Sequence, residues 1–325
     1  MDFYGYMRPN GKAGARNYVL LLPVNRSLNF IASNVERMTR NTRHFEIPAE
    51  TGRTEVDREV IARTLIGLMN NANVGGIVLL AVKSGAGSAY KNMCAERFEE
   101  EARKTGKPFR IVYLTNVGGS YNMLGETLRL TREVLLEVSD FRRENCPLSA
   151  LTLGVKCGTS DATSGIAGNP CVGAAFDQLI RAGGTAFFSE TTEIIGAEDL
   201  VAKRAVNESV AKKILSAAKH WEDKAKATGE DIRKINPIPA NIAAGISSLE
   251  EKSLGAIAKS GTSPIQDVLK YAEMPKGSGL YFVDSWMSSL SLPLCLTACG
   301  ATIMLYQMGG GKIAQHPMMP SINPT

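Results

Sequence analysis

Residues 151–170 read LTLGVKCGTSDATSGIAGNP, and an amphipathic helical pattern follows over residues 172–182. The apolar run 151–155 is typical of a buried strand. The fifteen residues from 156 to 170 are rich in hydroxyls and glycines, as in a loop that joins a strand to a helix. A strand, a turn and a helix in this order begin a βαβ unit, so the stretch predicts a parallel sheet.

The same alternation recurs along most of the chain. Further apolar runs predict buried strands at 18–23, 76–82, 110–114, 185–189, 281–283 and 302–306. Amphipathic stretches predict helices at 55–70, 90–105, 123–137 and 207–228. The predicted fold is α/β, with Rossmann-like parallel sheets, helices on both faces, and two α/β regions at 1–147 and 148–325. The polar stretch 142–146 is interpreted as a linker, and 229–261 as a long irregular segment.

Composition narrows the class of protein. The chain has 325 residues, of which 44% are hydrophobic and 21% charged, so it is able to bury a core and is neither collagen, a coiled coil nor disordered. Its 37 basic and 32 acidic residues give a net charge of +5, which suits an anionic small molecule. Aromatic residues do not interleave with basic clusters and no apolar run spans a bilayer, so neither nucleic acid nor membrane is expected.

The six cysteines form no CxxC pair, which predicts reduced thiols and a cytoplasmic location. Cys295 and Cys299 are four residues apart, and we interpret them as packed core residues rather than metal ligands.

Polar residues gather where the predicted strands end, which is where open α/β sheets bind ligands. Lys156 and Asp161 are candidates for charge and proton transfer. The candidate anion-binding groups in the same loop are Thr159, Ser160, Ser164 and Asn169. The alternative is that Asp161 and Ser164 only satisfy turns and helix caps.

A second cluster, 189–198, follows another apolar run. Glu190 and Glu193 share a face if this stretch is helical, although Thr192 capping a helix explains the same acids. Arg16 precedes the first strand together with Asn17, and it either clamps a carboxylate or forms a structural ion pair. Glycine-rich turns also follow the strands at 83–87 and 116–120.

Taken together and in order, the stretches 5–19, 156–170, 189–198, 250–255 and 279–284 resemble the catalytic region of the altronate/galactarate dehydratase family. The resemblance implies a Rossmann-like enzyme that eliminates a group β to a carboxylate. The sugar-acid dehydratases look rich in Cys and His where this chain has 25–27, 46–48 and 83–85, and a lysine of theirs is replaced by Ile242. In these respects the chain resembles the (2R)-sulfolactate sulfo-lyase β-subunit branch, which removes sulfite instead of water.

The resemblance therefore implies a carbon–heteroatom lyase that eliminates sulfite from a small 2-hydroxy carboxylate such as (2R)-sulfolactate and leaves a 2-keto acid. Lys156 or Glu190 is the expected base, and Asp161 or Glu193 is expected to orient the substrate or an ion. Arg16, Asn17 and Lys252 complete the expected substrate site. A divalent metal, iron, is expected as cofactor, with Cys157 and Glu193 as candidate ligands. The alternatives are a sugar-acid hydro-lyase and a non-catalytic paralogous subunit.

The resemblance also bears on partners. We expect a small anionic hydroxy acid as substrate, a separate small subunit equivalent to the N-terminal domain of other members, and a homo-oligomer. Because the chain stops at Thr325, a truncated C-terminal tail is expected. If Glu190 is a surface residue, its isosteric change to glutamine should abolish turnover at a stability cost well under about 1 kcal/mol.

Overall fold

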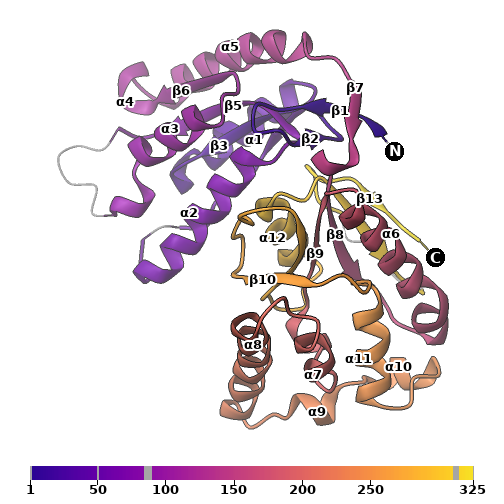
Figure 1. The fold of residues 1–325 in the computed structure, drawn as a ribbon. Helices are drawn as coiled ribbons and strands as arrows, with labels where there is room; N and C mark the ends of the chain where they lie inside the picture. The colour runs from indigo at the N-terminus through magenta and orange to yellow at the C-terminus, as the bar shows by residue number, and fades with distance from the viewer. Residues whose placement is uncertain (1, 50, 84–89, 310–314, 325) are drawn as a thin grey trace. The chain divides into compact units, whose positions relative to one another are not determined.

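The computed structural model describes residues 2–49, 51–83, 90–309 and 315–324, so most of the predicted turn at 83–87 lies outside the described residues (Figure 1). The chain divides into two compact units, Asp2–Cys146 and Pro147–Thr325. Both contain parallel sheets and helices, which confirms the α/β class. Among the described residues, no helix is both long and apolar enough to cross a membrane.

The N-terminal unit contains two sheets. A small sheet has the order β2-β1-β7, and a four-stranded parallel sheet has the order β4-β3-β5-β6. Its strands are β1 (Asp2–Met7), β2 (Ala13–Gly14), β3 (Tyr18–Pro23), β4 (Thr42–His44), β5 (Val74–Ala81), β6 (Phe109–Tyr113) and β7 (Glu144–Pro147). Its α-helices are α1 (Asn29–Met38), α2 (Glu55–Asn70), α3 (Ala95–Lys104), α4 (Leu114–Val117) and α5 (Ser120–Ser139).

Helices cover both faces of the four-stranded sheet. All eight residues of β5 are buried, as expected for a strand between two helical layers. Val78 and Leu80 pack in one cluster with residues of α1 and α5, while α2 and α3 also contact β5. The predicted bounds of α2 are confirmed; a capping box between Thr54 and Asp57 sets its first turn.

The C-terminal unit contains one parallel sheet of order β10-β11-β9-β8-β12-β13. Its strands are β8 (Thr152–Cys157), β9 (Thr185–Phe188), β10 (Ile265–Leu269), β11 (Gly279–Val283), β12 (Ile303–Gln307) and β13 (Ser321–Ile322). Its α-helices are α6 (Asn169–Arg181), α7 (Glu198–Ala202), α8 (Glu208–Ala227), α9 (Ile232–Ile235), α10 (Pro239–Ala243), α11 (Leu249–Ala258) and α12 (Ser291–Cys299).

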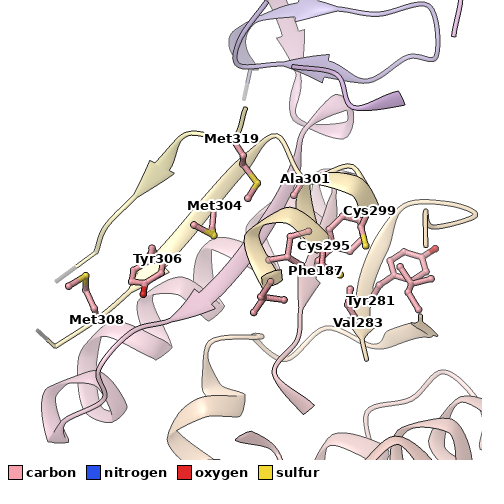
Figure 2. Close-up of a cluster of buried hydrophobic side chains, with 13 residues drawn as sticks. Phe187, Tyr281, Val283, Cys295, Cys299, Ala301, Met304, Tyr306, Met308 and Met319 are labelled. Atoms are coloured by element: carbon pink, nitrogen blue, oxygen red, sulfur yellow. The ribbon is translucent and has the colours of Figure 1, made fainter. Parts of the chain in front are cut away.

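A hydrophobic cluster joins α12 to the sheet of this unit. Figure 2 shows Cys295 and Cys299 of α12 among Phe187, Tyr281 and Met304 from three strands. Neither cysteine forms a disulfide, and both are buried in this cluster, which confirms that they serve in packing. The cluster holds α12 against the strands β8, β9, β11 and β12, whose carboxyl ends bear the candidate site.

Two predictions about irregular segments were wrong. The predicted linker 142–146 ends where the two units divide, but it is not irregular throughout: residues 144–147 form the strand β7 because they pair in the small sheet with β1. The segment 229–261 contains α9, α10 and α11, since caps at Asp231 and Ser248 start two short helices between its prolines and glycines. Local composition hid these elements because neighbouring parts of the fold stabilise them.

Candidate active site

The carboxyl ends of β8 and β9 bring the two polar loops of the sequence together. The strands are parallel neighbours, so the loops that follow Cys157 and Phe188 emerge at one edge of the sheet. A cavity of about 280 Å³ lies there, and we name it the Lys156 cavity. Its polar wall consists of Lys156, Cys157, Thr159, Ser160, Glu193, Asn241, Lys252 and Ser289. Six of the predicted site residues therefore line one cavity: Lys156, Cys157, Thr159 and Ser160 of the first loop, together with Glu193 and Lys252.

Glu190 is fully buried beside this cavity and is surrounded by hydrogen-bond donors. Lys156 Nζ donates to its Oε1 over 2.7 Å, and Lys259 Nζ donates to its Oε2 over the same distance. The backbone N–H of Cys157 also donates to Oε2, over 2.9 Å. The backbone of Glu190 has φ 70° and ψ 64°, a left-handed conformation that is costly for a residue other than glycine. The fold holds this carboxylate in place against that cost.

The two ammonium groups determine the ionisation of Glu190. Burial alone would raise the pKa of this carboxyl group, but Lys259 and Lys156 lower it to about 2. Burial would likewise lower the pKa of Lys259, but Cys157, Glu190 and Glu193 raise it above its usual value. The Glu190 carboxylate is thus charged, and it uses both oxygens to hold donors. It is better suited to positioning Lys156 than to accepting a proton from a substrate.

Glu193 has fewer contacts and lines the cavity directly. Its carboxylate is 3% exposed, and Lys252 Nζ lies 3.4 Å from its Oε1. Lys252 Nζ also donates to Asn236 Oδ1 over 2.6 Å, which fixes the ammonium at the cavity wall. A carboxylate with one ion-pair partner keeps lone pairs available, so Glu193 meets the geometric requirement for a general base better than Glu190 does.

The buried charges do not cancel. Three buried lysines, Lys156, Lys252 and Lys259, face two buried glutamates, Glu190 and Glu193, which leaves one positive charge in excess. A buried cation is costly unless an anion compensates it. The arrangement therefore favours an anionic ligand in the Lys156 cavity.

Asp161 belongs to the loop after β8 but points its carboxylate at that loop. Thr163 Oγ1 donates to Asp161 Oδ1 over 2.7 Å and the Ser164 N–H donates to it over 2.9 Å, and these bonds lower the pKa of Asp161. A Cβ on Gly309 would lie 2.1 Å from Asp161 Oδ2, so glycine is required there. The turn-forming alternative for Asp161 and Ser164 explains the hydrogen bonds from Thr163 and Ser164 to the Asp161 carboxylate.

Asp161, Ser164 and Asn169 line a second cavity of about 330 Å³. Ser160 and Lys252 line both this cavity and the Lys156 cavity. Asn169 Nδ2 donates to the carbonyl of Gly255 over 2.7 Å, which ties α6 to α11. The predicted binding residues of this loop are therefore divided between two neighbouring cavities.

Arg16 and Asn17 lie in the N-terminal unit, just before the amino end of β3. Asn17 is used structurally: its amide donates to Val138 O over 2.9 Å, and its Oδ1 accepts from Arg8 over 2.8 Å. Arg16 is exposed, and its guanidinium donates to its neighbour Ala15 O. Their contribution to a substrate site remains a prediction.

The donor set of the Lys156 cavity does not fit the expected iron. Cys157 and Glu193 both line the cavity, but within the described ranges no three His, Cys, Asp or Glu side chains gather to hold a metal ion. The Lys252 ammonium is 3.4 Å from Glu193, and a second positive group there disfavours a dication. The lysines instead supply the positive charge in this cavity.

Sequence reasoning missed Lys259 and Asn241, which both come from the segment interpreted as irregular. Asn241 Nδ2 donates to Ser160 O over 3.1 Å, so α10 is tied to the loop after β8. Lys252, Ala256 and Lys259 have the i, i+4, i+7 spacing of one helix face, and all three are buried. That periodicity would have placed both Lys252 and Lys259 on the buried face of a helix.

The pKa of Glu190 predicts how acid destabilises the protein. Because folding lowers this pKa from 4.5 to about 2, the stabilisation is present above pH 4.5 and is lost as the pH falls towards 2. The full effect is about 3 kcal/mol. Urea unfolding from pH 7 down to pH 3 should show this loss in the wild type, and a smaller pH slope in Glu190→Gln. Equal slopes would contradict the assignment.

Comparison with known proteins shows to which protein family the chain is related. Residues 148–324 match the C-terminal domain of D-galactarate/altronate dehydratase, and residues 5–139 match the second domain of D-galactarate dehydratase/altronate hydrolase. The chain is 33% identical to the (2R)-sulfolactate sulfo-lyase subunit beta of Chromohalobacter salexigens, over 98% of this chain and 80% of that protein.

Two dehydratases are similar over a smaller share of their length. Altronate dehydratase of Bacillus subtilis is 32% identical and galactarate dehydratase (L-threo-forming) of Escherichia coli is 31% identical. Each alignment covers 95% of this chain but only 62% of the dehydratase. All of these relatives are named as lyases or dehydratases, and both units of the chain match. The chain therefore belongs to the D-galactarate/altronate dehydratase family of lyases.

Proposed function

We propose that this chain eliminates sulfite from a small 2-hydroxy carboxylate such as (2R)-sulfolactate. The observation that carries the proposal is the excess of buried positive charge around a small cavity that also contains a carboxylate with an available lone pair. Sulfolactate carries a carboxylate and a sulfonate, so it supplies negative charge that compensates the excess positive charge of this cavity. The similarity to a sulfo-lyase subunit over 80% of its length supports the same reaction.

In the proposed reaction, Glu193 takes the proton from the carbon that bears the hydroxyl. The electron pair forms the double bond to the neighbouring carbon, and the carbon–sulfur bond breaks with its pair leaving on sulfite. The resulting enol takes up a proton at its terminal carbon and releases its hydroxyl proton, which gives the 2-keto acid. Lys156 and Lys252 stabilise the negative charge that develops on the substrate carboxylate. Glu190 acts as a positioning residue because it holds the Lys156 ammonium.

A sugar-acid hydro-lyase is the second candidate, and the two similar dehydratases favour it. Loss of water needs a proton on the departing hydroxyl, whereas sulfite leaves as a stable anion. Lys156 and Lys252 both place an ammonium group in the cavity wall, and either one is positioned to supply that proton. A purely non-catalytic role has less support, since burying five charged side chains is costly and brings nothing to a scaffold.

We further propose that a small separate subunit works with this chain. The name of the similar sulfo-lyase chain, subunit beta, supports such a partner. Sulfite release should be measured with this chain alone and after a candidate small subunit is added. Full activity of the chain alone would reject the two-subunit proposal but leave the reaction intact.

The substrate is tested by comparing (2R)-sulfolactate, altronate and galactarate in parallel. Sulfite release from sulfolactate together with formation of a 2-keto acid would support the sulfo-lyase. Dehydration of either sugar acid, without sulfite release, would replace it by the hydro-lyase.

Salt should weaken the capture of a dianionic substrate. The positive charge of the cavity attracts a dianion more strongly than a monoanion, and dissolved ions screen this attraction. We therefore expect kcat/KM for sulfolactate to fall with added salt more steeply than kcat/KM for altronate, a monoanion. Steady-state rates at several salt concentrations measure this dependence of kcat/KM for both substrates. A salt-independent kcat/KM for sulfolactate would refute electrostatic capture.

A further inference from the structure

A second cavity of the C-terminal unit has a different character from the Lys156 cavity. It has a volume of about 720 Å³, within the range of small-molecule sites, and we name it the tryptophan cavity. Its apolar wall includes Trp221, Trp286, Ile232, Ile235, Ile238 and Met287. The two indole rings meet edge to face, with centroids 5.8 Å apart, and Trp221 Nε1 donates to Asp284 over 2.9 Å. Trp286 is 61% exposed, which is unusual for so large an apolar side chain.

The charged groups of this cavity lie at defined places. Glu193 and Lys252 are buried and line the Lys156 cavity as well, as do Ile238 and Met287. Lys224 is exposed, and its Nζ lies 4.9 Å from the centre of the Trp221 ring. The lining therefore contains two ammonium groups and one carboxylate in a mostly apolar wall, and Lys252 is 3.4 Å from Glu193. The cavity is complementary to a molecule with an apolar body and a single anionic end.

We propose that the tryptophan cavity binds a monocarboxylate with an aromatic or branched aliphatic body. The body lies against Trp221, Trp286 and the isoleucines, where burial of apolar surface favours binding. The carboxylate accepts from the Lys252 ammonium at the wall between the two cavities. This site is additional to the one proposed for sulfolactate. If the proposed function holds, the ligand and the substrate carboxylate compete for Lys252.

Intrinsic fluorescence tests the proposal directly. The chain has two tryptophans and both line this cavity, so its whole tryptophan emission reports on the site. Titration of the full chain with 4-phenylbutyrate should give a saturable change in emission. The neutral 4-phenylbutyramide should bind about tenfold more weakly, because it lacks the charge-assisted hydrogen bond to Lys252. Butyrate, which lacks the ring, should give no saturable change.

Variants separate the two lysines. In Lys252→Met the advantage of 4-phenylbutyrate over its amide should disappear, whereas Lys224→Met, the control in the same cavity, should retain it. Loss of the advantage in Lys224→Met alone would overturn the assignment of the carboxylate. Trp286→Ala changes an exposed side chain and should keep the fold while it weakens both ligands. Unchanged binding in Trp286→Ala would overturn the location of the site.

Two further results would overturn the proposal. The first is no saturable emission change at millimolar 4-phenylbutyrate. The second is tryptophan emission that acrylamide does not quench in the free protein, since another chain or unit would then cover the cavity. Neither result depends on turnover. A protein that releases sulfite but does not bind 4-phenylbutyrate therefore rejects this proposal and keeps the proposed function.

Discussion

Replacing Glu190 by glutamine is expected to lower the free energy of unfolding by about 3–5 kcal/mol. The change removes the negative charge between the ammonium groups of Lys156 and Lys259, both hydrogen bonded to it over 2.7 Å and all three buried. Two cations then remain in the interior without their counter-ion, and at least one N–H donor faces the amide nitrogen. Turnover should also be lost, because Lys156 loses its anionic partner, although its Nζ still donates to the carbonyl of Cys157 over 2.6 Å. Chemical denaturation and sulfite release measure the two effects.

The matched control is Glu250→Gln, which makes the same chemical change on an exposed side chain of α11. It should alter the unfolding free energy by less than about 0.5 kcal/mol and leave turnover unchanged. Lys259→Met should destabilise the wild type more than it destabilises Glu190→Gln, because the variant already lacks the anion that pairs with Lys259. Equal costs in the two backgrounds would contradict the buried ion pair.

This expectation differs from the one that the sequence suggested. A glutamate two residues after a strand resembles a surface helix cap, for which the change to glutamine is nearly neutral. The premise of a surface position was wrong, because Glu190 has a left-handed backbone and is fully buried, so we expect a large stability cost instead.

Replacing Glu193 by glutamine should lower kcat by about 10²–10⁴ if this carboxylate is the general base. The amide keeps the shape of the side chain but does not accept the proton. KM should change little, since Lys156 and Lys252 still bind the anionic groups. Stability should fall less than in Glu190→Gln, because the ammonium of Lys252 is 3.4 Å from Glu193 and also donates to Asn236.

Steady-state kinetics of Glu193→Gln, with Glu250→Gln as control, measure this prediction. Near-normal turnover in Glu193→Gln would exclude Glu193 as the base. If Lys156→Met loses turnover and Glu193→Gln does not, the proton is taken by Lys156, the first alternative that the sequence suggested.

Much of the fold was predictable because it depends on local patterns. The strands of the central sheets are continuous apolar runs, so the bounds of β3, β5, β8 and β12 were predicted to within two residues. For α2, the N-cap residue, the helical period of the apolar residues and the length of the pattern all indicate the same bounds. The short helices α9, α10 and α11 were missed since each depends on contacts with distant residues, such as the bond from Asn241 to Ser160.

The sequence by itself determined the α/β class, the family and the two loops at which chemistry is expected, because strand ends and motif order are linear properties of the chain. Only the tertiary structure decided the role of each side chain. In the folded chain Glu190 accepts hydrogen bonds from two lysines, Asp161 accepts from its own turn, and Glu193 lines the cavity. Lys259 lies 69 residues after Glu190, and their contact arises where α11 packs beside the carboxyl end of β9. Burial and charge pairing depend on contacts between residues that are far apart in the sequence, so local sequence patterns do not predict them.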